Sequence, residues 1–426
     1  CSLIYLTSGY ENETGTNYKW TTVEKFCLTN TTMSATLARL QYLDFPECSQ
    51  EALIFLVKHF SSEARHGVPG RTSPGEKLAI DVAQEFIVEL YKRKYHRKMK
   101  LNAVHELQLL EMVCRTLQEC PEQACYKAFT AIFGGHIEAA KITLMTKLVS
   151  MAISVSCGPV LRCVALWMQE QGSQSQCVCD VAQQVVEDYG QLYPGLGPAF
   201  RALPSVSSLF TCNFVTAITT IYTYTDVSKT PPKELLECIV DWISSDPCLC
   251  SDSVRLVRIQ ANFTCPLGGL IRWCILGPIV TSMAGESNSS VQGGTSAAKD
   301  LKQTNTQDSK LMSLFSKLHL GVLLCLQAYQ SMELNEQLFS YGDIFIVSKT
   351  LSSYYRGGQC REELIDAINT AVDRLAQIIQ MALATKSLSD KFDFLQVREG
   401  LPPNRLLDMM LSMKYATQRT EAMDLS

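Results

Sequence analysis

Three groups of residues in this 426-residue chain have types and spacings that chemistry could use. The first is the pentapeptide HELQL, which begins at His105 and approaches the HExxH sequence of zinc proteases. In that motif a second histidine follows one helical turn later, so that both rings reach the same metal ion. Leu109 occupies that position here. We therefore expect Glu106 to be no more than an acidic residue in the first turn of a helix that Asn102 caps.

The second group consists of cysteines, of which the chain has 18. Zinc knuckles need two residues between their ligands, and no CxxC sequence occurs in the chain. Many of the cysteines lie instead within apolar runs, as small buried side chains do in a reducing compartment. The pattern favours reduced, structural cysteines over a zinc site, and a redox role is the weakest alternative. The close pairs are Cys120 and Cys125, Cys177 and Cys179, and Cys248 and Cys250.

The third group is the basic segment KRKYHRKMK at 92–100, which contains no acidic residue. Such a segment could be a nuclear-import signal, could contact an RNA backbone, or could be a solvated connector before the next helix. The sequence leaves these three interpretations open. Its charged residues are Lys92, Arg93, Lys94, Arg97, Lys98 and Lys100.

Other catalytic signatures are missing from the sequence. It contains no GxxxxGK[ST] phosphate loop and no GxSxG nucleophile elbow. The net charge of −4 does not attract the whole chain to nucleic acid or to an anionic membrane. No uninterrupted apolar run reaches the roughly 18–20 residues of a membrane span. We expect a protein that is not an enzyme, without cofactor, metal or small-molecule substrate, and without membrane attachment.

The elements that position these residues are expected to be helices almost throughout. Apolar residues recur every three or four positions along most of the chain, which is the period of an amphipathic helix. Strand signals are weak, and the one tempting run, at 343–347, is isolated. The tryptophans at 167, 242 and 273 each fall on an apolar stripe, so we expect them in the core. The longest stripe consists of Leu364, Ile368, Ala371, Leu375, Ile378 and Ala382.

The composition also predicts boundaries. Residues 1–32 are rich in Thr and Asn without a helical period, and we expect a non-native or disordered extension before Met33. More than half of 281–310 is Gly, Ser, Thr, Asn or Gln, so this segment is expected to be a disordered linker. We predict an all-α fold, an irregular α-solenoid of helical hairpins like HEAT or armadillo repeats. Its two parts would be an N-terminal helical repeat domain at 33–280 and a C-terminal helical domain at 311–426.

The two last predicted helices carry more apolar residues than one buried face requires. A helix that is apolar on more than one side is either central to a large core or covered by a partner. In 406–413 the apolar residues are nearly contiguous, and we expect Met409, Met410 and Met413 to bind a partner protein. In 364–382 the residues beyond the main stripe are Ile365, Val372, Ile379 and Met381.

The chain resembles the Integrator complex subunit 15 family of animals in eight apolar segments, which occur in the family's order between about residues 48 and 411. Residues 1–32 have no counterpart in the family, and 248–266 are dissimilar. The segments are LNAVHELQLLEMVC at 101–114, KLVSMAISVSCGPVLRCVALWMQ at 147–169, FTCNFVTAIT at 210–219, PPKELLECIVDWISSDP at 231–247, GLIRWC at 269–274, SKLHLGVL at 316–323, VDRLAQ at 372–377 and LPPNRLL at 401–407.

This resemblance implies a nuclear, all-helical, non-enzymatic scaffold subunit of the Integrator complex. Such a subunit supports 3′-end processing of small nuclear RNA and attenuation of transcription by RNA polymerase II. It bridges the arm module, made of subunits 10, 13 and 14, to the rest of the complex. Its partners would be other Integrator subunits, with indirect association with RNA polymerase II and nascent RNA. The alternative is an RNA-contacting accessory subunit that uses 92–100.

Overall fold

A computed structural model describes most of the chain between residues 38 and 413. The predictions for residues 1–32 and for Arg93, Lys94 and Lys100 lie outside the described residues. The described ranges are 38–63, 74–87, 90–92, 97–99, 102–134, 139–251, 265–289, 297–330, 338–357, 362–388 and 393–413.

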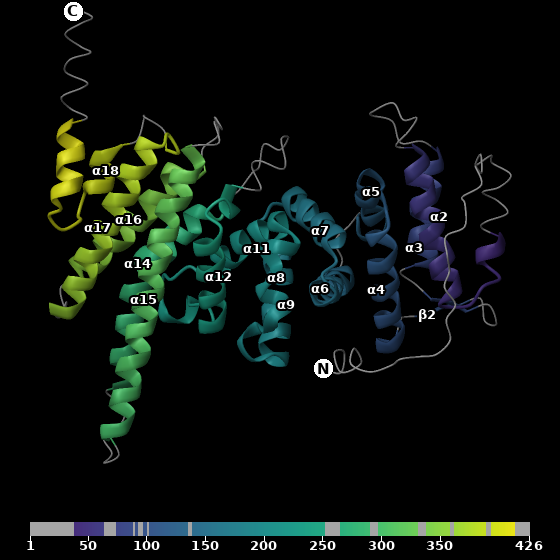
Figure 1. Cartoon of the computed structure of the whole chain (residues 1–426), viewed down its shortest axis with the longest axis horizontal. Coiled ribbons are helices and arrows are strands. Elements are labelled where there is room, and N and C mark those ends of the chain that lie inside the picture. The colour runs from purple at the N-terminus through teal and green to yellow at the C-terminus, as the bar shows by residue number, and fades with distance from the viewer. Residues whose placement is uncertain are drawn as a thin grey trace, which may run out of the picture. The chain divides into compact units, whose positions relative to one another are not determined.

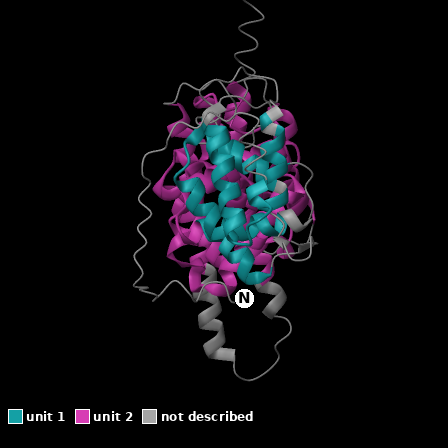
Figure 2. Cartoon of the chain, turned by 90° about the vertical axis from the view of Figure 1, so that its right-hand side faces the viewer, with its two compact units in different colours: residues 1–152 teal, residues 153–426 magenta. Residues whose placement is uncertain are grey.

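Contacts divide the chain into two compact units, residues 1–152 and residues 153–426 (Figure 2). The described part of both units is helical except for one short antiparallel hairpin (Figure 1). The predicted all-α class is therefore confirmed. The predicted solenoid and the predicted domain boundaries at 33–280, 281–310 and 311–426 stay predictions.

Unit 1 is built around α2, which packs against α3, α4 and α5. The Ser49 hydroxyl on α2 donates to the Phe86 carbonyl at the end of α3, over 2.8 Å. The predicted cap of α4 is confirmed, because Asn102 accepts a hydrogen bond from the backbone N–H of His105. The elements are α2 (Glu47–Glu63), α3 (Pro74–Phe86), β1 (Leu90–Lys92), β2 (Arg97–Met99), α4 (Ala103–Gln118), α5 (Glu122–Phe133) and most of α6 (Ala139–Ser154).

Unit 2 contains the remaining helices and is centred on α14, which packs against α11, α15, α16 and α17. Residues 405–413 form a further helix at its C-terminal end. The elements are α7 (Gly158–Gln171), α8 (Gln176–Leu192), η1 (Pro194–Leu196), α9 (Gly197–Arg201), α10 (Leu203–Val206), α11 (Ser208–Ile221), η2 (Val227–Lys229), α12 (Lys233–Ser245), η3 (Leu249–Ser251), α14 (Leu267–Ser289), α15 (Ala297–Gln330), α16 (Tyr341–Arg356), α17 (Glu362–Ala384) and α18 (Phe394–Arg398).

The core of unit 2 contains buried aromatic side chains from α14 and from the elements packed around it. Trp273 of α14 is fully buried, and its indole N–H donates to the Tyr222 carbonyl. The Tyr224 ring lies edge-on to Trp273 and also to Phe315 of α15. Trp167 and Trp242 are buried as well, so the prediction of core tryptophans is confirmed.

The isolated strand signal at 343–347 and the polar composition at 281–310 both coincide with helices in the structure. The run at 343–347 lies inside α16, whose start is fixed by a capping box between Ser340 and Asp343. Within 281–310, α14 continues to Ser289 and α15 begins at Ala297, where a linker was expected. A helix that is already nucleated in a core gains one hydrogen bond for each residue added, so it can extend into a polar segment.

Two stretches of the described helices are long and apolar enough to cross a membrane, judged by length and composition alone. They are Leu267–Ala284 in α14 and Ser309–Gln330 in α15, and the bent pair that ends with α11 would be a third if it formed one span. The sequence prediction missed them because single polar residues interrupt each apolar run. Two thirds of the α14 stretch is buried within the fold, as its central place in unit 2 requires.

Candidate partner-binding surface

The helix at 405–413 begins at a capped and anchored position. Asn404 accepts a hydrogen bond from the backbone N–H of Leu407 over 3.0 Å, as an N-cap residue does. The Asn404 amide nitrogen also donates to the Asp373 carboxylate of α17, over 2.6 Å. One side chain therefore both starts the helix and ties it to α17.

A second contact ties the middle of this helix to α18. Arg398 donates from Nε to Asp408 over 2.7 Å and from a terminal nitrogen to the Leu401 carbonyl over the same distance. The hydrogen bond from Arg398 holds the pKa of Asp408 below its usual range. The helix is thus attached to α17 at its start and to α18 one turn later.

The two faces of this helix differ in exposure. Leu407 and Met410 are buried, whereas the side chains of Met409 and Met413 are 48% and 62% exposed. Residues four apart lie next to each other on one helical face. Of the three methionines predicted to bind a partner, the structure brings Met409 and Met413 together at the surface and places Met410 in the core.

The basic segment lies at the hairpin of β1 and β2. The antiparallel register pairs Lys92 with Arg97, and Tyr91 with Lys98. The remaining basic residues of the segment fall outside the described strands. The hairpin does not choose between nuclear import, RNA contact and a solvated connector.

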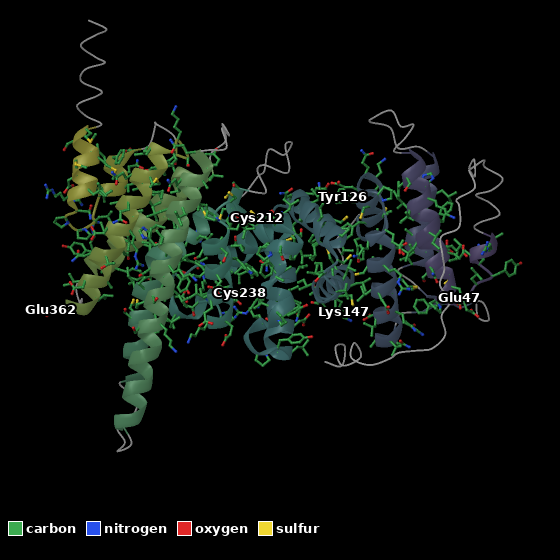
Figure 3. All side chains as sticks on the ribbon, viewed as in Figure 1. Glu47, Tyr126, Lys147, Cys212, Cys238 and Glu362 are labelled. Carbon is green, nitrogen blue, oxygen red and sulfur yellow. The ribbon has the colours of Figure 1, made fainter. Side chains whose placement is uncertain are left out.

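The HELQL sequence has a structural role in unit 1. Leu109, which occupies the position of the second histidine of a zinc motif, is buried. Glu106 forms an ion pair with Lys147 of α6. Lys147 is labelled in Figure 3. This carboxylate therefore links α4 to α6.

None of the described cysteines forms a disulfide bond. Cys177 and Cys179 lie two apart on α8, where side chains do not face each other. Cys177 approaches the Ser175 hydroxyl at 3.3 Å, and Cys179 points to the Gln174 carbonyl at 3.9 Å. In the part of the chain that the structure covers, no three His, Cys, Asp or Glu side chains are arranged to hold a metal ion.

One cluster of thiols was not foreseen. Cys325 of α15 donates to the sulfur of Cys250 over 3.8 Å, and Cys212 and Cys265 donate to the Cys250 carbonyl over 3.6 and 3.1 Å. The hydrogen bond from Cys325 together with burial raises the pKa of Cys250 well above its usual range, and burial does the same for Cys265. Protonated, buried thiols are poor nucleophiles. Figure 3 labels Cys212 in this region of α11.

Sequence reasoning also missed a polar cavity of about 520 Å³ within unit 2. Its walls are a row of threonines on α11, the start of α14 at Gly268 and Gly269, and the start of α16 at Asp343. Arg272 of α14 lines it as well. The signal was present in the sequence, since Arg272 is the one charged residue in the apolar run LIRWCI at 270–275.

The chain is similar over most of its length to proteins of one family. A family model described as Integrator complex subunit 15 matches residues 34–403. The Mus musculus protein of this name is 31% identical over 385 residues, which are 87% of this chain and 84% of the relative. The Danio rerio protein is 32% identical, over 79% of this chain and 72% of its own length. The Drosophila melanogaster protein is 26% identical, over 86% and 93%. The residues that the family model matches end before Met409.

Proposed function

The chain belongs to the Integrator complex subunit 15 family, and we propose that it is a non-enzymatic scaffold subunit of the Integrator complex. Membership of this complex implies other Integrator subunits as partners and the nucleus as location. In this proposal the protein bridges the arm module of subunits 10, 13 and 14 to the rest of the complex. It thereby supports 3′-end processing of small nuclear RNA and attenuation of RNA polymerase II transcription, with only indirect association with polymerase and nascent RNA.

The observation that carries the proposal is the exposed methionine pair on an anchored helix. Met409 and Met413 form one apolar face, and Asn404 and Asp408 attach their helix to α17 and α18. Methionine is flexible and polarisable, so it adapts to the shape of an apolar partner surface. A helix that is already held in place loses little conformational entropy when a partner covers it.

The proposal predicts how binding responds to salt. Contacts between exposed charges are screened over a Debye length of about 8–10 Å at physiological ionic strength, whereas apolar contacts survive. Recovery of the arm subunits with this protein should therefore persist in a pull-down series up to high salt. Dissociation at moderate salt would show that charge holds the complex.

A double variant tests the methionine surface directly: Met409→Asp combined with Met413→Asp places two charges on the apolar face. We expect loss of the arm subunits from the pull-down, with an unchanged melting temperature. Val104→Asp is the control, because Val104 is also an exposed apolar residue, 64% exposed, but lies on α4 of unit 1. Normal recovery with the double variant would contradict the proposal.

The alternative function is RNA contact through the basic segment at 92–100, in which Lys92 and Arg97 occupy opposite positions of the hairpin. Like charges at opposite positions of an antiparallel pair repel each other and destabilise the pair, as expected for Lys92 and Arg97. An anion such as an RNA phosphate would neutralise this repulsion. If this segment binds RNA, the logarithm of the affinity should fall linearly with the logarithm of salt concentration. Replacing Lys92 and Arg97 by Ala should then flatten that slope.

A further inference from the structure

We propose that the cavity at the start of α14 binds an acidic side chain of a peptide segment from a partner protein, with Arg272 as the group that receives the carboxylate. This inference rests on the proposed function in one respect, namely that the ligands of this chain are proteins. It concerns a surface distinct from the methionine pair at 409 and 413.

The cavity is formed by close packing of three helices within unit 2. A Cβ atom on Gly268 would lie 2.7 Å from the Asp343 Cγ atom, so glycine at this position allows the Asp343 carboxylate of α16 to approach α14 closely. Gly269 allows the same approach to Thr219 of α11. The volume of about 520 Å³ lies within the range of roughly 300–1,000 Å³ found for ligand pockets.

Arg272 is the unusual residue of this cavity, because its guanidinium lacks a partner among the residues that the structure describes. It forms no hydrogen bond and no ion pair with any described residue, and its Nε atom is buried without an acceptor. Burial lowers the pKa of Arg272, and the nearby Asp343 charge opposes this only in part. An unpaired guanidinium that has lost much of its water is unfavourable, and its planar donors match a carboxylate.

Arg374 of α17 shows what a structural arginine looks like in the same unit. Burial lowers its pKa as well, yet its guanidinium donates to the Cys274 carbonyl and to the Ser316 hydroxyl, each over 2.8 Å. These two bonds connect α17 to α14 and α15. Arg272 has a comparable environment but makes no such bonds, so packing of the fold does not explain its charge.

Asp343 does not fill the place of the missing partner. Its Oδ2 atom accepts from the backbone N–H and the hydroxyl of Ser340, each over 2.8 Å, and so holds the cap of α16. Its charge lies close enough to favour the charged form of Arg272. The carboxylate is therefore a neighbour of Arg272 that remains committed to the helix start.

The remaining wall specifies what else the ligand must offer. Thr216, Thr219 and Thr220 donate their hydroxyl hydrogens to carbonyls of α11, over 2.9, 3.1 and 2.9 Å. Their oxygen atoms are left as acceptors, and Asp343 Oδ1 is a further one. A ligand that complements this wall carries N–H donors beside its acid. A peptide with Asp or Glu supplies both, through its side chain and its backbone amides.

The charges favour a carboxylate over a phosphate. The cavity contains one cation, Arg272, and one carboxylate, Asp343. A phosphate group carries up to two negative charges and is repelled by a neighbouring carboxylate. A single carboxylate neutralises Arg272 and meets less repulsion.

Stability provides the first test. Arg272→Met should leave the melting temperature of the full chain unchanged or raise it, because it removes an unpaired, partly buried charge. Arg374→Met is the matched control and should lower the melting temperature, because it removes two hydrogen bonds between helices. If Arg272→Met lowers the melting temperature as much as Arg374→Met does, Arg272 is a structural residue and the proposal is overturned.

Binding provides the second test. The full chain is used to select from a displayed library of random linear peptides, and binding of each selected peptide is then measured. We expect selected peptides to contain Asp or Glu, and replacement of that acid by Asn or Gln should weaken binding at least about tenfold. Arg272→Met should weaken binding of the acidic peptide to the same extent, and the two changes together should add little further.

Three results would overturn the proposal: selection of no peptide, selection of peptides without an acid, or independent effects of the two changes. Tighter binding of a phosphoserine version of a selected peptide would overturn the choice of a carboxylate. The Met409→Asp and Met413→Asp double variant should bind the peptides normally. Failure of the cavity proposal is therefore distinguishable from failure of the methionine surface.

Discussion

Two helices near the C-terminus, α17 and the helix at 405–413, have the same excess of apolar residues but use it differently. In α17, Val372 and Ile379 widen the apolar stripe, and both are buried, because α14, α15 and α16 all pack against this helix. In the helix at 405–413, Met409 and Met413 remain exposed on the face opposite Leu407. An apolar excess thus indicates that a helix needs cover on two sides, and the number of neighbouring helices decides whether the chain provides it.

The largest expected effect comes from placing a charge in the covered helix. Ile379→Asp should prevent unit 2 from folding. An unpaired charge in the core destabilises a protein by more than about 4 kcal/mol, which is much of the roughly 5–15 kcal/mol that stabilises a typical protein. Circular dichroism and gel filtration would detect the loss. Ile379→Leu is the control and should cost less than about 1.5 kcal/mol. A folded Ile379→Asp variant would remove the distinction between the two helices.

The second largest effect is expected in α14, the helix against which α17 packs. Trp273→Ala in α14 should destabilise the protein by about 3–5 kcal/mol, since it removes a buried ring and a hydrogen bond to the Tyr222 carbonyl. Urea unfolding would measure this loss. Trp273→Phe should lose less, because it keeps an aromatic ring in the core. An unchanged unfolding curve with lost partner binding would instead make Trp273 a binding residue.

An intermediate effect depends on pH. Burial lowers the pKa of His319 on α15 to about 4, and the charge of Arg374 on α17 acts in the same direction. Between pH 6.5 and 4 the unfolded chain therefore binds more protons than the folded one, and this contribution to stability is lost as the pH falls. Because the ring is partly solvated, we expect a loss of about 1–2 kcal/mol across this range. Comparing melts of the parent and of His319→Phe at several pH values would isolate it, and equal pH dependence of the two proteins would contradict it.

The smallest effect on stability is expected at the exposed face. Met409→Asp and Met413→Asp should each change the free energy of unfolding by less than about 0.5 kcal/mol, as surface substitutions do. The two substitutions together should instead reduce the recovery of the arm subunits in the pull-down. A melt that falls as far as that of Trp273→Ala would show that this face is covered within the chain.

Much of the secondary structure could be predicted because its causes are local. The cap at Asn102 and the helical repeat of apolar residues both depend on neighbours within a few positions. At 281–310 the polar composition predicts a linker, and the packed helices α14 and α15 extend into this segment from both sides. The family, too, followed from short segments in order.

The candidate surface was predicted in part. The sequence indicated that Met409, Met410 and Met413 form an apolar run, but it could not tell that Met410 faces the core and the other two face outward. That assignment depends on where α17 and α18 hold the helix, through Asn404 and Arg398.

By itself the sequence determined the helices, the family and the absence of known catalytic motifs, because each of these is encoded in short stretches of the chain. The tertiary structure decided which contacts form between residues far apart in sequence. It brings Cys325 to Cys250, gives Arg374 two partners on other helices, and leaves Arg272 in a polar cavity without a partner among the described residues. Two arginines in apolar runs look alike in the sequence, and their difference exists only once the acceptors of other helices are in place.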